Sequence, residues 1–306
     1  MEHLWIILSV GAALLQSVRT AAQRDLNRRM STLATTYVRS LFGLPVMIVY
    51  LAGVLAATGE GLPHLSAAYL GYTLTGAMAQ VAATMLLISM FRLRNFGVGT
   101  MLTKCDVVIT AIMGALLFSE TLSWGGVLAL VVVMAGVIAL SLGKSGLAGL
   151  TGGGTLLAAL ADKPTLVALG CASCFSVSYL TLREAALVIG EGSFLWRGGW
   201  TVVIATAMQT VIVGAYLARV EAGLFAKLKP DLKLATFIGV TSAIGSIGWF
   251  TAFALQNASY VRAVGQIEVV FTLLIAALYF REQVRPMEYL GIALTLVGVV
   301  MFRLAA

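Results

Sequence analysis

The sequence predicts an all-α membrane protein with ten transmembrane helices, arranged as two inverted five-helix repeats. Three observations lead to this fold class. The chain is strongly apolar, it divides into ten apolar runs of about the length of a membrane span, and its second half repeats the pattern of its first half. Together they predict one membrane unit that has been duplicated within a single chain.

The composition excludes a soluble globular domain. Of 306 residues, 60% are hydrophobic and 11% are charged, and the mean hydropathy is +0.97. A soluble domain of this size cannot bury so much apolar surface. The formal net charge of +7 is typical of loops that face anionic lipid and the cytoplasm, so no nucleic-acid partner is expected. The predicted environment is the lipid bilayer of a bacterial-type inner or plasma membrane.

Ten apolar runs approach the roughly 20 residues that cross a bilayer as a helix. Most segments between them are short, and the longest, Gly143 to Lys163, is rich in glycine and typical of a linker. We therefore expect a first repeat over 1–143, a linker over 144–163 and a second repeat over 164–306. The predicted spans are 4–23, 33–55, 68–90, 97–118, 124–142, 165–182, 194–217, 234–256, 260–280 and 287–303.

The duplication is clearest in a segment that opens with an acid, continues through an apolar run and closes on a glutamate. Its copies are Asp106–Glu120 and Glu268–Glu282, which lie 162 residues apart (268 − 106). The register continues beyond them, because Gly136-Val137 matches Gly298-Val299. Five helices is an odd number, so the second copy must cross the membrane in the opposite direction. Matched mid-helix residues of such halves are expected to approach each other near the bilayer centre.

The distribution of positive charge predicts the orientation. The loops after spans 1, 3, 5, 7 and 9 hold 13 Lys and Arg residues, whereas the other side holds three at most, Arg183, Arg262 and Arg303. Because positively charged loops stay in the cytoplasm, both termini are predicted to be non-cytoplasmic. The 13 residues are Arg24, Arg28, Arg29, Arg92, Arg94, Lys144, Lys163, Arg219, Lys227, Lys229, Lys233, Arg281 and Arg285.

Asp106 and Glu268 are the first candidates for a functional role, because each lies deep in its span. Asp106 is about ten residues from the start of its span, which puts it near mid-bilayer at 1.5 Å per residue, and Glu268 has nearly the same depth. An ionisable group there costs at least roughly 2.5–3.5 kcal/mol on insertion scales, so each must face a cavity or a partner. One hypothesis is that the pair couples proton movement or binds a cationic group of a substrate. The alternative is that ion pairs or hydrogen bonds lock both acids into a structural role.

Lys104 and Gln266 occupy matched positions two residues before the acids. Residues two apart point to different sides of a helix, so Lys104 does not form a simple pair with Asp106. We expect Lys104 either to meet Glu268 or an anionic group of a substrate, or to snorkel to an interface.

Four other residues are candidates for the lining of a substrate path. Arg39 and Arg197 are matched and lie near the ends of their spans, where they either snorkel to headgroups or act in substrate binding or gating. Gln80 and Trp249 lie inside their spans, where they either line a cavity or make packing and hydrogen-bonding contacts.

Other kinds of site are not indicated. Glu120 and Glu282 are expected to end their helices near water and to mark boundaries. The only histidines, His3 and His64, lie outside the spans, and no cluster of His, Cys and carboxylate has metal-ligand spacing, so no metal or cofactor is predicted. No phosphate-binding glycine-rich motif is present, which leaves ATP-driven pumping unsupported.

These features resemble the EamA-type branch of the drug/metabolite transporter superfamily, and the resemblance covers nearly the whole chain. Each half has an acid, an apolar run and a glutamate ahead of a Gly-containing final helix. In that family proline often follows the acid and glycine often precedes the glutamate. Here Val107 and Val269 replace the proline, and Ser119 and Arg281 replace the glycine. The substitution removes the proline on which a kink in these helices would rest.

The resemblance implies a secondary carrier, often an exporter, for small metabolites such as amino acids, amines or drugs. The substrate would lie centrally between the halves and move by alternating access, with proton or exchange coupling. The family commonly keeps its termini in the cytoplasm, which conflicts with the charge distribution of this chain. We follow the charge distribution and predict non-cytoplasmic termini.

Two other classes of function are weighed against a carrier. An intramembrane enzyme acting on a lipid-linked substrate would require catalytic groups clustered at one interface, and the chain has matched acids at mid-depth instead, so no enzyme is predicted. A scaffold or receptor would have no evident use for buried ionisable residues. The sequence leaves a homodimer open.

Overall fold

The computed structural model describes residues 3–90, 103–145, 163–221, 223–278 and 286–305, and every regular element in this part of the chain is a helix. Seven of the helices described are long and apolar enough to cross a membrane, and shorter apolar helices begin at Asp106 and Trp124. An all-α membrane fold is therefore confirmed, while the count of ten spans stays a prediction. The elements are α1 (Leu4–Leu26), α2 (Thr32–Thr58), α3 (Ala67–Met90), α5 (Asp106–Leu117), α6 (Trp124–Ser145), α8 (Lys163–Val188), α9 (Phe194–Val220), α10 (Leu224–Leu228), the 3-10 turn η2 (Lys229–Asp231), α11 (Leu232–Leu255), α12 (Ala258–Gly265), α13 (Glu268–Leu278) and α14 (Pro286–Ala305).

Matched serines start matched helices in the two repeats. Ser31 precedes α2 and its Oγ accepts a hydrogen bond from the backbone N–H of Ala34 at 3.1 Å. Ser193 precedes α9 and accepts from the N–H of Trp196 at 3.2 Å. Each serine satisfies an N–H that has no partner within its helix, an arrangement typically worth about 1 kcal/mol. The repeat thus extends to the local signals that begin these helices.

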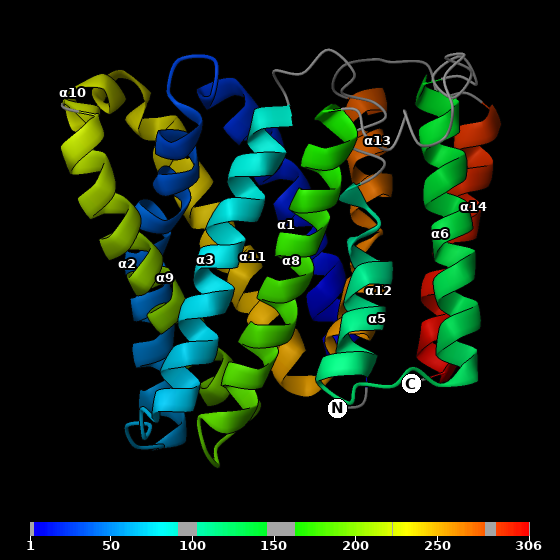
Figure 1. The fold of residues 1–306 in the computed structure, drawn as a ribbon, viewed down its shortest axis with the longest axis horizontal. Helices are drawn as coiled ribbons and strands as arrows, with labels where there is room; N and C mark the ends of the chain where they lie inside the picture. The colour runs from blue at the N-terminus through cyan, green and yellow to red at the C-terminus, as the bar shows by residue number, and fades with distance from the viewer. Residues whose placement is uncertain (1–2, 91–102, 146–162, 222, 279–285, 306) are drawn as a thin grey trace.

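The helices stand side by side, and both chain termini lie at the same end of the bundle (Figure 1). In this view α1 runs away from that end while its counterpart α8 runs toward it, and α2 and α9 are opposed in the same way. The packing follows the same relationship, because α1 packs on α11 and the matched pair α8 and α3 also pack together. The opposed directions are those expected of inverted halves.

A close seam joins α6 and α14, the last helices of the two halves. A Cβ added at Gly136 of α6 would lie 2.5 Å from Thr295 Oγ1 and 2.6 Å from the Thr295 backbone nitrogen. A Cβ added at the matched Gly298 of α14 would lie 2.4 Å from Val133 Cγ2 and 2.9 Å from the Val133 nitrogen. Small residues let membrane helices approach this closely, so the matched glycines define the seam.

The predicted spans 97–118 and 260–280 are not continuous helices, which corrects the expectation from the sequence. Both are interrupted by a turn immediately before the acid, at 104–105 and at 266–267, so that Asp106 begins α5 and Glu268 begins α13. The turn after α12 forms without a proline, because it is closed by hydrogen bonds from an N–H to the carbonyl three residues earlier. One of them runs from the N–H of Gln266 to the carbonyl of Ala263 at 3.2 Å. Each carboxylate then lies at a helix N-terminus, where the unpaired N–H groups favour negative charge.

The segment predicted as a linker falls largely outside the described residues. Helix α6 continues to Ser145 and α8 begins at Lys163, which leaves 146–162 undescribed. The linker and the domain boundaries therefore stay predictions.

Candidate functional site

Asp106 forms a buried ion pair with Arg262. Arg262 Nη2 donates to Asp106 Oδ2 at 2.7 Å, and both side chains are 3% exposed. Gln266 Nε2 donates to the other carboxylate oxygen at 3.2 Å. The guanidinium also lies over the rings of Tyr179 and Trp249, 4.5 and 5.1 Å from their centroids, a favourable cation–π arrangement. Asp106 therefore has a fixed ion-pair partner, which is what a structural role for this acid requires.

Glu268 has a different and more accessible environment. Its Oε2 lies 3.2 Å from Lys104 Nζ and accepts a hydrogen bond from Gln16 Nε2 at 2.9 Å. The Lys104 side chain is 20% exposed and that of Glu268 is 10% exposed. Lys104 therefore meets Glu268, as one interpretation of the sequence predicted. Of the two acids, Glu268 is the one whose partner is partly exposed.

A polar chain connects the two acids across the halves. Gln16 of α1 binds Glu268 through its amide nitrogen and accepts a hydrogen bond from Trp249 Nε1 through its amide oxygen at 3.1 Å. Trp249 in turn packs against Arg262, the partner of Asp106. A chain of contacts through α1 and α11 therefore joins the surroundings of the two acids.

Arg39 and Gln80 lie in a second polar cluster. Arg39 Nη2 donates to Gln80 Oε1 at 3.0 Å and to Gln209 Oε1 at 3.1 Å. Gln209 Nε2 also donates to Gln80 Oε1 at 2.8 Å and to the carbonyl of Ala77 at 3.1 Å. Arg39 is 5% exposed, so it is held among amides inside the bundle and does not snorkel. Arg197 was predicted to match Arg39, but it lies four residues after Ser193 whereas Arg39 lies eight residues after Ser31, so the two occupy different levels of the matched helices. The Nε of Arg197 is buried without a hydrogen-bond partner in the described part of the chain.

Glu120 is a buried contact between the halves, which corrects its expected place near water. It is 5% exposed, pairs with Arg183 Nε and accepts a hydrogen bond from the N–H of Ala258 at 3.0 Å. Arg183 also donates to the carbonyl of Phe253 at 2.7 Å and to Asn257 Oδ1 at 2.8 Å. The pairing explains the burial, because the guanidinium supplies the charge and donors that the carboxylate needs. Glu282 lies outside the described residues.

Ion pairs involve cations that were counted on both sides of the membrane. Arg183 and Arg262, counted on the sparsely charged side, are paired inside the protein. Arg29 and Lys227, counted on the other side, are paired as well. The orientation of the chain nevertheless stays a prediction.

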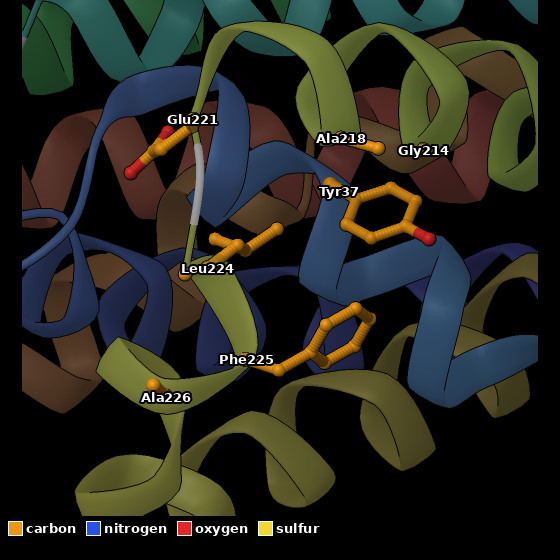
Figure 2. Close-up of a pocket in the computed structure, with 8 residues that line it drawn as sticks. Tyr37, Gly214, Ala218, Glu221, Leu224, Phe225 and Ala226 are labelled. Carbon is orange, nitrogen blue, oxygen red and sulfur yellow. The ribbon is translucent and has the colours of Figure 1, made fainter.

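A small pocket lies apart from these clusters, at the end of α9 (Figure 2). Its volume is about 190 Å³ and Tyr37, Gly214 and Glu221 are among its lining residues. Glu221 accepts a hydrogen bond from Ser31 Oγ at 2.7 Å and pairs with Lys227 at 3.7 Å. The pocket is a feature of the helix ends and does not reach the central acids.

Several central residues escaped the analysis of the sequence. Gln16, Arg19 and Gln209 lie inside predicted spans as isolated polar residues, which is the signal that selected Gln80. Arg262 lies near the start of the predicted span 260–280 and was counted only among the charges of the sparsely charged side. Tyr179 carried no signal, since an aromatic residue in a membrane helix is usually a packing contact.

Comparison with known proteins agrees with the duplicated fold. Residues 3–142 and 163–304 each match the EamA-like transporter family. A solved structure titled only as a crystal structure of a protein is similar over 97% of this chain and 94% of its own, with a TM-score of 0.71 and 15% identity, a likeness that shows the fold alone. No curated protein matches. The two matches to one family cover nearly the whole sequence, and the chain therefore belongs to the EamA-like transporter family.

Proposed function

We propose that this protein is a secondary active transporter that exports small polar metabolites by alternating access between two inverted five-helix halves. The observation that carries the proposal is the pair of interrupted helices, each with its acid at the break. Discontinuous membrane helices with polar groups at mid-depth are the usual way in which secondary carriers build a site for substrate and coupling ion. Family membership supports small solutes as the cargo.

Alternating access requires contacts between the halves that open in turn at the two ends. At the end with the termini, Trp196 Nε1 donates to the carbonyl of Gly61 at 2.8 Å, and the backbone N–H and Oγ of Ser193 donate to Glu60. At the opposite end, Arg29 pairs with Asp231. These contacts join separate segments near the ends of their helices. They are our candidates for the two gates.

We assign the two acids different roles in coupling. Glu268 is the proposed proton carrier, because its partner Lys104 is partly exposed and can be displaced when the carboxyl group is protonated. Asp106 is the proposed positioning residue, because Arg262 holds it in a pair that excludes water. If the protein instead exchanges one solute for another without moving protons, neither acid has to change its charge.

Transport into proteoliposomes tests the proposal. Vesicles would be offered labelled amino acids, organic amines and carboxylic acids under a pH gradient and, separately, under exchange conditions. We expect wild type to accumulate at least one class, Glu268→Gln to keep exchange but lose accumulation driven by the gradient, and Asp106→Asn to lose both. Glu191→Gln, at an exposed position, is the control.

Two results would contradict the proposal at different levels. Absence of movement of any solute in wild type would remove the transport function. Accumulation by Glu268→Gln and Asp106→Asn equal to that of wild type would leave transport intact but take both acids out of the mechanism.

A further inference from the structure

We propose that the transported solute carries an anionic group, a carboxylate or a phosphate, and that Arg19 and Arg39 bind this group. The inference rests on the proposed transport function and specifies its substrate class. Both arginines are buried, at 7% and 5% exposure, and neither forms an ion pair with a carboxylate in the part of the chain that the structure describes.

Arg19 is the clearer case of a buried cation without a counter-ion. Its Nε has no hydrogen-bond partner among the described residues. The Oε2 of the central acid Glu268 is already occupied by Lys104 and Gln16. A buried guanidinium is normally paired or fully hydrogen-bonded. Arg19 can therefore still bind a negatively charged hydrogen-bond acceptor.

Arg39 is held in place by neutral groups alone. Gln80 and Gln209 accept its hydrogen bonds through their amide oxygens, and Gln209 is fixed in turn by the carbonyl of Ala77. Amides orient a guanidinium without neutralising it, which is how a site keeps a positive charge available for a ligand. An anion bound by Arg39 would supply the negative charge that these neutral amides do not.

The two arginines also share a depth. Arg19 is seven residues before the end of α1 at Leu26, and Arg39 is seven residues after the start of α2 at Thr32. At 1.5 Å per residue each lies about 10 Å from the same end of the bundle. Their burial excludes snorkelling over that distance, so both guanidinium groups lie inside the bundle at a similar depth.

The charge balance of the centre favours an anionic ligand over a cationic one. Of four cationic side chains in the interior, two are paired with Asp106 and Glu268, and the other two have no carboxylate partner in the described chain. Nε and Nη1 of Arg262 are further buried donors without acceptors in the described chain. A carboxylate or phosphate supplies both the missing charge and the missing acceptors. The four cations are Arg19, Arg39, Lys104 and Arg262.

Thermal unfolding of the purified full-length protein tests the inference. Sodium phosphate and sodium acetate are the anionic probes, choline chloride is the cationic probe, and sodium chloride at equal ionic strength is the reference. We expect phosphate or acetate to raise the unfolding midpoint of wild type by at least about 2 °C, and whichever anion acts more strongly identifies the headgroup. The shift should be lost in Arg19→Met and Arg39→Gln and retained in Arg28→Gln, which alters an exposed arginine.

Stability without ligand separates a binding role from a structural one. Removing a buried charge that has no partner should leave the unfolding midpoint of Arg19→Met equal to or above that of wild type. A fall as large as that of Arg262→Met would make Arg19 a structural residue and overturn the inference, and so would stabilisation by choline alone or by no probe. Transport of a cationic solute would end this inference and leave the proposed function standing. Anion binding without any transport would remove the transport function and leave Arg19 and Arg39 as an anion-binding site only.

Discussion

Ser17 and Ser176 make the same contact from opposite halves of the chain. Ser17 Oγ donates to the backbone carbonyl of Glu268 at 3.2 Å, and Ser176 Oγ donates to that of Asp106 at 2.9 Å. Each serine lies on the first helix of its own half and reaches the interrupted helix of the other half. The acids are therefore held by reciprocal bonds between the repeats.

Replacing either serine should have matched, modest effects. We expect Ser17→Ala and Ser176→Ala each to reduce the free energy of unfolding by about 0.6 kcal/mol, the average for a hydrogen bond between membrane helices. Each carbonyl keeps a second donor, the hydroxyl of Thr272 or of Thr110, which limits the loss. Equilibrium unfolding in mixed micelles measures the effect, and a loss above about 2 kcal/mol in only one variant would contradict the equivalence.

The pair of Asp106 and Arg262 should be costly to break and cheaper to remove whole. Arg262→Met leaves a buried carboxylate unpaired and is expected to cost about 3–5 kcal/mol. Adding Asp106→Leu should recover a large part of that loss, since no unpaired charge then remains. A double-mutant cycle on unfolding free energies reports the coupling, and additive effects of the two changes would argue against a coupled pair.

The seam between α6 and α14 should reject added volume at its matched glycines. Gly136→Ala and Gly298→Ala place a methyl group within 3 Å of backbone atoms of the facing helix, so each is expected to cost about 1–3 kcal/mol. Gly11→Ala on α1, where nothing lies within 4 Å, should be neutral or stabilising. The comparison of the three unfolding free energies is the measurement, and equal effects at all three sites would refute the close approach.

The contact of Glu60 with Ser193 should weaken in acid. Hydrogen bonds from the backbone N–H and then the hydroxyl of Ser193 lower the pKa of Glu60 below its ordinary value of 4.5. Because the pKa in the folded state is the lower one, the stabilisation is complete above 4.5 and disappears as the pH falls through the folded-state value. The difference in unfolding midpoint between wild type and Glu60→Gln should therefore be larger at pH 7 than at pH 3.5. A difference that is independent of pH would contradict this role.

The repeat and the two acids could be found from the sequence because both are periodic or compositional signals. A polar residue in an apolar run is visible without a structure, and Asp106, Glu268 and Lys104 stood out for that reason. The partner of a buried charge is not visible in this way, since pairing depends on which helix faces it. Arg262 was counted only as a charge of the sparsely charged side, although it is buried against Asp106.

The interruption of the two acid-bearing helices could not be predicted from the sequence either. Proline is the usual signal for a break, and Val107 and Val269 stand where proline was sought. The turns before Asp106 and Glu268 are held by contacts with the other half, including those of Ser176 and Ser17. Such breaks are a property of the assembled bundle.

The contact of Gly136 and Gly298 with the facing backbones restricts how the halves can move. Thr295 and Val133 lie against the glycine backbones at two matched points, so the two helices touch main chain to side chain at both. In the alternating-access cycle proposed above, this pair is the place where the halves can stay in contact, and we propose it as the pivot about which they turn.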